Sequence, residues 1–128
     1  MFFLKMKKKP YKNLKFSFGK NWQNFLKNID ESSIKEAEKS LLSFLKIKSL
    51  KNKRFLDIGC GSGLFSLAAK NLEAEVLSFD LDKQSVSCCD FLKKKFYPTD
   101  KKWVIKSGSI LNKSFVNKLG YYDIVYSW

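Results

Sequence analysis

The sequence is poor in the residues that most often bind metals, form disulfide bonds or act as acids and bases. Its 128 residues include no histidine, three cysteines, two prolines and one arginine, Arg54. Cys88 and Cys89 are adjacent, Cys60 stands apart, and no CxxC pair occurs. The sequence therefore predicts no metal site and no disulfide framework. Three reduced thiols are typical of a cytoplasmic protein.

Long hydrophobic runs are also missing. No stretch approaches the roughly 18 consecutive apolar residues of a membrane span. The N-terminal stretch MFFLKMKKKP places its apolar residues before its charges, which is the reverse of a secretory signal. A cytoplasmic protein without a membrane span is expected. Because 45% of the residues are hydrophobic, the chain has enough apolar residues for the core of one domain.

Acidic residues are few, and the 25 basic against 12 acidic residues give a net charge of +13. Such a charge can favour binding to a nucleic acid or to an anionic membrane surface. Nearly all of it comes from lysine, however, and Phe, Asn, Ile and Leu are frequent, as codon bias in an AT-rich genome produces. Sites that read nucleic acid usually use arginine at phosphates and base edges. The composition favours codon bias and leaves a nucleic-acid patch as the alternative.

Residues 1–53 form the first of two expected regions, a basic N-terminal arm followed by helices. The first 20 residues are rich in lysine and aromatic side chains, and we expect them to be loosely ordered or to pack as a lid. Helical spacing of apolar residues predicts a short helix over 21–28. Ser33 and Glu36 have the spacing of a capping box, which predicts a second helix with an apolar face.

From Arg54 onward, apolar strand patterns alternate with helical patterns. Strands are predicted over 55–58, 76–79, 103–105 and 123–128, and helices over 64–72, 83–96 and 114–119. Asp82 fits a cap of the second of these helices better than a ligand. This alternation predicts βαβ units and a parallel sheet.

Between the first strand and its helix lies the glycine-rich turn of RFLDIGCGSGLFSLAAK, with Gly59, Gly61 and Gly63 at alternate positions. Glycine permits backbone angles closed to other residues and lets a ligand approach closely. The helix that follows offers free N–H groups and the positive end of its dipole. In an open parallel sheet, ligands bind beyond the carboxyl ends of the strands.

Two common ligands of such turns do not fit. A phosphate loop would read GxxxxGK[ST], and the turn contains no such pattern. A dinucleotide site would read GxGxxG, but the position of the third glycine holds Leu64, or Ser66 if the pattern starts at Gly61.

Four segments resemble a known family in its own order. LDIGCGSG resembles motif I of the class I S-adenosylmethionine-dependent methyltransferases, and EVLSFDLD, KSGSIL and YDIVYSW resemble its second, third and fourth strand motifs. The resemblance covers about residues 54–128. It implies an α/β fold with a Rossmann-like, doubly wound parallel sheet, here incomplete, with strands one to four of the usual seven behind N-terminal helices. It also implies methyl transfer from S-adenosyl-L-methionine.

The resemblance assigns cofactor-binding roles to the residues of the turn. Asp57 would orient the turn and approach the amino group of the methionine part, directly or through water. Gly59, Gly61 and Gly63 would form the floor beneath the methionine and ribose. Cys60 faces the same site by its position. A nucleophilic role for this thiol is not favoured, since no base is near it in the sequence.

The other roles implied by the resemblance lie after the later strands. Asp80 would accept hydrogen bonds from the ribose hydroxyls, and a carboxylate at a strand end can accept from both hydroxyls of a diol. Leu81 would pack on the adenine, while Ser109 and Ile110 would meet its edge. Ser127 would lie beneath the sulfonium. The family often has an acid or amide where Ser109 stands.

In the family's sheet, strands three, two, one and four lie side by side and three more follow. The sequence stops at Trp128, so we expect the N-terminal part of a methyltransferase, with 54–128 as a truncated cofactor-binding half-domain. The strand over 123–128 would then lie at the sheet edge. It is apolar on both faces and has no lysine, proline or bulge to blunt it, so self-association is expected.

The methyl acceptor and the catalytic residues are not identified by the sequence. A general base is needed only for weakly nucleophilic acceptors, and no residue is assigned to that role. The alternative reading is a basic nucleic-acid-binding protein that uses a Rossmann-like core as its scaffold. A fragment of an RNA methyltransferase would combine the two readings.

Overall fold

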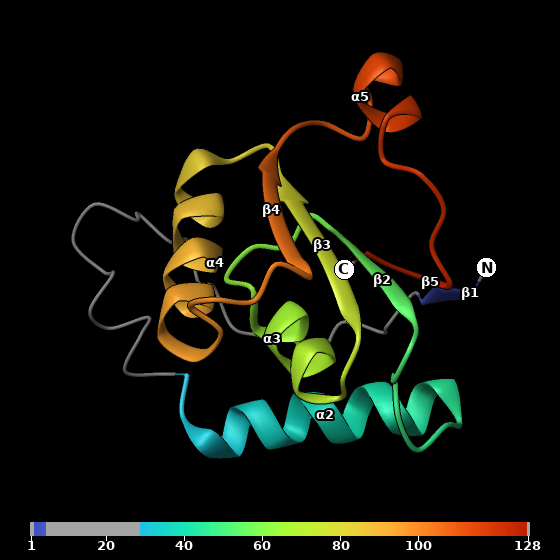
Figure 1. The fold of residues 1–128 in the computed structure, drawn as a ribbon, viewed down its shortest axis with the longest axis vertical. Helices are drawn as coiled ribbons and strands as arrows, with labels where there is room; N and C mark the ends of the chain where they lie inside the picture. Colours follow the sequence, from blue (N-terminus) through green and yellow to red (C-terminus); the bar gives the residue numbers. More distant parts are fainter. Residues whose placement is uncertain (1, 5–28, 128) are drawn as a thin grey trace, which may run out of the picture.

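The computed structural model describes residues 2–4 and 29–127 of the chain. In the described part, strands and helices alternate along the chain as expected (Figure 1). The strands are β1 (Phe2–Leu4), β2 (Arg54–Ile58), β3 (Glu75–Asp80), β4 (Trp103–Ser107) and β5 (Ile124–Ser127). The helices are α2 (Glu31–Leu45), α3 (Leu64–Asn71), α4 (Lys83–Phe96) and α5 (Lys113–Asn117).

The strands form one parallel sheet in the order β1-β5-β2-β3-β4. The last four are the expected neighbours, strands four, one, two and three of the resemblance. Asp57 is in register with Ser78 of β3 on one side and with Tyr126 of β5 on the other. The predicted α/β class, with a parallel Rossmann-like sheet, is confirmed, and all carboxyl ends of the strands point to the same edge.

The predicted edge position of β5 is wrong. Phe2 of β1 is in register with Ile124, so the backbone of β5 pairs on both sides. Phe2–Leu4 thus forms a strand, whereas the sequence predicts that the first 20 residues are loosely ordered or pack as a lid. Self-association loses the basis we had given it and stays a prediction. The predicted helix over 21–28 and Trp128 lie outside the described residues.

Helix caps follow local hydrogen bonds that the sequence pattern located only in part. The cap of α2 is Asp30, not Ser33, because the Asp30 carboxylate accepts the Ser33 N–H at 2.7 Å. The helix therefore starts before the predicted capping box. Asp82 caps α4 as predicted and accepts from the N–H groups of Gln84 and Ser85.

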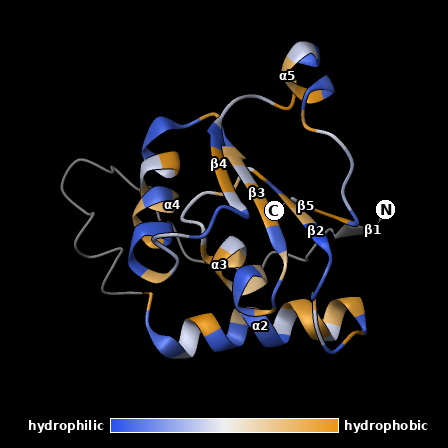
Figure 2. Ribbon diagram, viewed as in Figure 1, coloured by the Kyte–Doolittle hydropathy of each residue, from blue (hydrophilic) through white to orange (hydrophobic). Residues whose placement is uncertain are grey.

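Two apolar cores lie on opposite faces of the sheet, because successive side chains of a strand alternate. Helices α2, α3 and α4 cover one face, where Phe55 and Trp103 are fully buried. The short α5 covers part of the other face, where Leu56 and Phe79 lie in a smaller cluster with Leu119. Hydrophobic residues concentrate along the strands, whereas α4 carries many hydrophilic residues (Figure 2).

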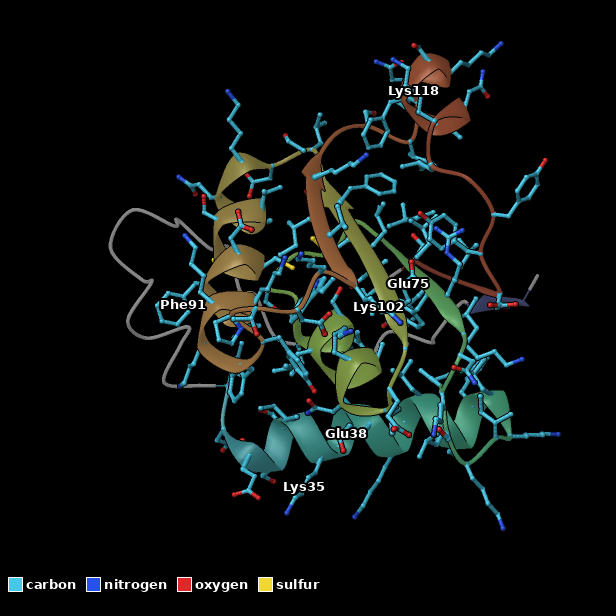
Figure 3. The ribbon with its side chains drawn as sticks, in the orientation of Figure 1. Lys35, Glu38, Glu75, Phe91, Lys102 and Lys118 are labelled. Atoms are coloured by element: carbon cyan, nitrogen blue, oxygen red, sulfur yellow. The ribbon has the colours of Figure 1, made fainter. Side chains whose placement is uncertain are left out.

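The single arginine ties the amino ends of three segments together. The Arg54 guanidinium donates to the Tyr121 carbonyl at 2.6 Å and lies 4.6 Å from the centre of the Tyr122 ring. Its Nε is 3.6 Å from a carboxylate oxygen of Glu75, which begins β3 (Figure 3). The backbone N–H of Arg54 also donates to Asp123 at 2.8 Å.

Replacing Arg54 with lysine is expected to lower the free energy of unfolding by about 1 to 2 kcal/mol, because one ammonium cannot stack on the ring and serve both partners. Urea denaturation measures the change. Lys53→Ala, at the exposed neighbouring residue, is the control and should change it by less than about 0.5 kcal/mol. An Arg54→Lys variant as stable as the wild type would show that the contacts carry no net stability.

Candidate cofactor-binding site

The glycine turn lies at the carboxyl edge of the sheet, between β2 and α3. The N–H groups of Gly59 and Cys60 both donate to the Phe79 carbonyl, at 2.9 and 3.0 Å. The Gly61 N–H donates to the Asp80 carboxylate at 2.9 Å. These bonds attach the turn to the end of the neighbouring strand β3 and hold its backbone in one conformation.

The three glycines of the turn serve two different purposes. All have positive φ angles, of +68° at Gly59, +52° at Gly61 and +84° at Gly63. A Cβ built at Gly59 or Gly61 would meet no atom within 4 Å, so open space lies over both residues. A Cβ at Gly63 would come within 2.8 Å of the Cys89 Sγ. Gly63 therefore allows α4 to pack closely, and its predicted contact with a ligand stays a prediction.

Asp80 connects the loops that surround the edge. One carboxylate oxygen accepts the Gly61 N–H, and the other accepts the N–H of Asp82 at 2.9 Å. Its main-chain carbonyl accepts the N–H of Gly108, which follows β4, at 3.0 Å. A carboxylate oxygen has two lone pairs, so each still has acceptor capacity for a hydroxyl group of a ligand.

Asp57 is buried beneath the turn and exposes 2% of its surface. Its carboxylate accepts the Ser66 hydroxyl at 2.6 Å. Burial raises the pKa of Asp57 to about 7, the Ser66 hydroxyl opposes the shift, and the nearby Asp80 adds to it. The Asp57 carboxyl group therefore gains or loses its proton near neutral pH.

Two of the thiols, Cys60 and Cys88, are poor nucleophiles in this environment. A hydrogen bond with Cys89 is the largest cause that raises the pKa of the Cys60 thiol, and burial is the second. Burial also raises the pKa of Cys88 to about 11. Since the thiolate is the reactive form, the geometry supports the reading of Cys60 as a small residue of the turn.

The remaining predicted residues lie around the same edge. Leu81 follows Asp80 and is 72% exposed, and Ile110 is 49% exposed in the loop after β4. Ser109 precedes it and is half-buried. Ser127 ends β5 directly opposite Ile58 in the register. The fold therefore brings all ten predicted positions to one edge of the sheet.

The loop that carries Ser109 and Ile110 is held by an aromatic contact. A Cβ at Gly108 would clash with the Phe115 ring, so only glycine fits beneath that ring. Phe115, on α5, in turn meets Phe79 of β3 edge to face, with ring centroids 5.0 Å apart. The loop after β4 thus takes its position from packing of α5 on β3.

Sequence reasoning missed three buried polar side chains behind Asp57. Ser66 bonds to Ser78 at 2.6 Å between their oxygens, and the Trp103 indole donates to Ser78 at 3.0 Å. The Trp103 side chain is fully buried in the core. A serine within the apolar strand EVLSFD, and another on the buried side of α3, were the available signals.

The site has the features that a nucleoside with a charged tail requires. Two glycines leave open space for a ligand above a rigid backbone, and a carboxylate at the end of β3 can accept from a diol. Apolar side chains border the edge at Leu81 and Ile110. The residues present therefore fit the S-adenosylmethionine implied by the resemblance.

Residues 2–4 and 29–127 contain no group of three or more potential metal ligands placed to hold an ion. None of the helices in these ranges has the length and apolar character needed to cross a membrane.

Comparison with known proteins gives a consistent result. Residues 36–96 match the family model described as Ribosomal protein L11 methyltransferase (PrmA). The ribosomal protein L11 methyltransferase of Helicobacter hepaticus is 39% identical over 49 residues, covering 38% of this chain and 16% of that protein. The ubiquinone biosynthesis O-methyltransferase of Pelagibacter ubique is 35% identical over 74 residues, covering 55% of this chain and 31% of that protein.

The fold has counterparts among solved structures. A methyltransferase of Podospora anserina, solved with S-adenosylhomocysteine, superimposes with a TM-score of 0.58 and 18% sequence identity. The superposition covers 84% of this chain and 47% of that structure. The chain thus spans less than a third of either curated relative and about half of this structural neighbour.

Proposed function

We propose, because this chain belongs to the class I S-adenosylmethionine-dependent methyltransferase family, that its carboxyl edge binds S-adenosylmethionine and that the protein transfers the methyl group to an acceptor. The observation that carries the proposal is the pairing of the open glycine turn with Asp80, which the Gly61 N–H joins at 2.9 Å. When bound, the cofactor supplies an activated methyl group on its sulfonium.

The residues of the chain bind and orient the cofactor in this proposal. Gly59 and Gly61 lie beneath it, and Asp80 accepts from the ribose hydroxyls. Asp57 supplies a negative charge beneath the turn for the ammonium of the methionine part. Alignment of donor and acceptor contributes much of the rate of such a transfer, so rigid loops are the main contribution of this edge.

Further positions around the edge complete the proposed site. Leu81, Ser109 and Ile110 border the adenine, and Ser127 lies beneath the sulfonium. Cys60 and Gly63 shape the turn, and the packing of Gly63 on Cys89 supports that role.

The residues of this edge do not identify the methyl acceptor. One matched relative is named for a ribosomal protein and another for an O-methylation in ubiquinone biosynthesis, so related chains serve different acceptors. We infer an acceptor in the cytoplasm, where three unpaired, buried thiols are stable. RNA remains the second acceptor class, supported by the charge of +13 alone.

Calorimetry with S-adenosylhomocysteine tests the proposal. The wild-type chain is expected to bind it, and the Gly61→Val variant to bind at least about tenfold more weakly, because a branched side chain would occupy the open space and strain a left-handed backbone. Gly120→Val is the matched control. Gly120 also has a positive φ, of +85°, but precedes β5 near Arg54, away from the carboxyl edge.

NAD should not compete with S-adenosylhomocysteine, since the turn lacks the third glycine of the dinucleotide pattern. Equal affinity in the wild type and the Gly61→Val variant would contradict the proposed site. Binding of RNA with a steep salt dependence, and of no nucleoside, would support the scaffold alternative instead.

A further inference from the structure

A chain of buried hydrogen bonds runs behind the glycine turn, across three strands and a helix. It starts at the Trp103 indole on β4, passes through Ser78 on β3 and Ser66 on α3, and ends at Asp57 on β2. The donor–acceptor distances are 3.0, 2.6 and 2.6 Å in that order. The first three side chains are fully buried and Asp57 is 2% exposed, so water does not compete for these bonds.

While Asp57 is ionised, the chemistry of the donors gives the chain one direction. An indole N–H can only donate, and each serine hydroxyl has one proton. Because Ser66 donates its proton to Asp57, the proton between the two serines comes from Ser78. Ser78 accepts from Trp103 at the same time. If Ser66 donated to Ser78 instead, Ser78 would accept from two donors, and its own proton would have no acceptor among these four residues.

We propose that Trp103, Ser78 and Ser66 form a relay that holds Asp57 as an oriented carboxylate and thereby sets the affinity of the site for the ammonium group of the cofactor. The inference rests on the proposed function. It assigns positioning roles to three residues that do not touch the ligand and act through Asp57. A carboxylate is the form that three aligned donors stabilise, since only that form accepts without donating.

The surroundings of Asp57 explain why such a relay is needed. Asp80 at the end of β3 repels a second negative charge, and Tyr126 on β5 and the Cys60 thiol are neutral neighbours whose pKa values the Asp57 charge helps to raise. Burial disfavours the charge further. Among the causes of the Asp57 shift, Ser66 alone lowers the pKa, through its hydroxyl and its backbone N–H.

The ligand-free protein provides the first test. The 13C resonance of the Asp57 carboxyl group, followed from pH 4 to 9, reports its protonation. In Ser66→Ala the midpoint is expected to rise by about one pH unit, the equivalent of one charge-assisted hydrogen bond. Ser66→Thr keeps a hydroxyl and should restore it. Ser85→Ala is the control. It removes a buried hydroxyl on α4 that is bonded to Asp82, and it should leave the Asp57 midpoint unchanged.

Ligand binding provides the second test. S-adenosylhomocysteine carries the ammonium group, whereas methylthioadenosine has the same nucleoside without the amino-acid tail. The affinity for S-adenosylhomocysteine should increase as the pH rises from 6 to 8 in the wild type. Ser66→Ala should weaken it about fivefold at pH 7, because a midpoint about one pH unit higher leaves about a tenth of Asp57 ionised instead of about a half. The affinity for methylthioadenosine should change with neither the pH nor the variant, which separates recognition of the ammonium from a general loss of structure.

The outcomes distinguish the relay from the proposed function. If S-adenosylhomocysteine binds but Ser66→Ala changes neither the Asp57 midpoint nor the affinity, the relay is overturned and the proposed function stands. If neither nucleoside binds the wild-type chain, both fail. Should Ser66→Ala not fold, Ser78→Ala removes the next donor and Ser78→Thr restores it. Equal Asp57 midpoints in that pair would also overturn the relay.

Discussion

Replacing Asp80 with alanine is expected to weaken the binding of S-adenosylhomocysteine by more than about 100-fold. Two charge-assisted hydrogen bonds to the ribose hydroxyls would be lost, and each contributes about 1.5 to 3 kcal/mol. The same substitution removes the acceptor of the Gly61 N–H, so the turn loses its side-chain attachment to β3. The main-chain bond from Gly108 to residue 80 remains, so the loop after β4 should keep its position.

Two further variants separate these contributions. Asp80→Asn keeps an oxygen that can accept the Gly61 N–H but loses the charge and one acceptor, and is expected to bind with intermediate affinity. Asp82→Ala removes the neighbouring carboxylate, which caps α4, and should cost about 1 kcal/mol of stability with little effect on affinity. Calorimetry at one pH compares the affinities of the three variants for S-adenosylhomocysteine. An Asp80→Ala variant that binds within about threefold of the wild type would exclude Asp80 as the ribose acceptor.

Replacing Asp57 with asparagine is expected to stabilise the protein above pH 7 while weakening the binding of S-adenosylhomocysteine. The pKa of Asp57 is raised from 3.8 to about 7 by burial, so between these values the folded chain holds a proton that the unfolded chain has lost. Wild-type stability therefore falls with rising pH across this window through this group. The full difference corresponds to a free energy on the order of 4 kcal/mol.

The measurement is the difference in melting temperature between the Asp57→Asn variant and the wild type from pH 4 to 8.5. The difference should be small near pH 4, grow in favour of the variant up to about pH 7 and then level off. Asp82→Asn is the matched control, because hydrogen bonds from Ser85 lower the pKa of Asp82 instead. It keeps a good helix cap and should show no gain with pH. A difference for Asp57→Asn that does not vary with pH would contradict a buried, titrating carboxyl group.

Much of the fold and of the candidate site was predictable because its signals are local. The alternation of strand and helix patterns after Arg54, the glycine spacing and the Asp82 cap each depend on residues a few positions apart. In a parallel sheet the carboxyl ends of all strands lie at one edge, so a set of strand ends in the sequence already implies a common site. The ten predicted positions meet at that edge for this reason.

The contacts that set the properties of the site join residues far apart in the sequence. The Trp103 indole reaches Ser78 across 25 residues, and Ser66 reaches Asp57 across nine, through the register of β2, β3 and β4 and the packing of α3. No local pattern specifies such a register. The charge state of Asp57 follows from burial and from these donors, so it was not predictable either.

The sequence by itself determined the order of the elements, the position of the glycine turn and the residue types at the strand ends, because these depend on periodicity and on backbone preferences of neighbouring residues. Only the tertiary structure decided that Phe2–Leu4 pairs with β5, that Arg54 joins β3 to the residues before β5, and that a tryptophan on β4 is hydrogen-bonded through two serines to Asp57. Each of these depends on which distant segments lie side by side, and that choice is made by the burial of apolar surface in the whole sheet rather than by any short stretch of chain.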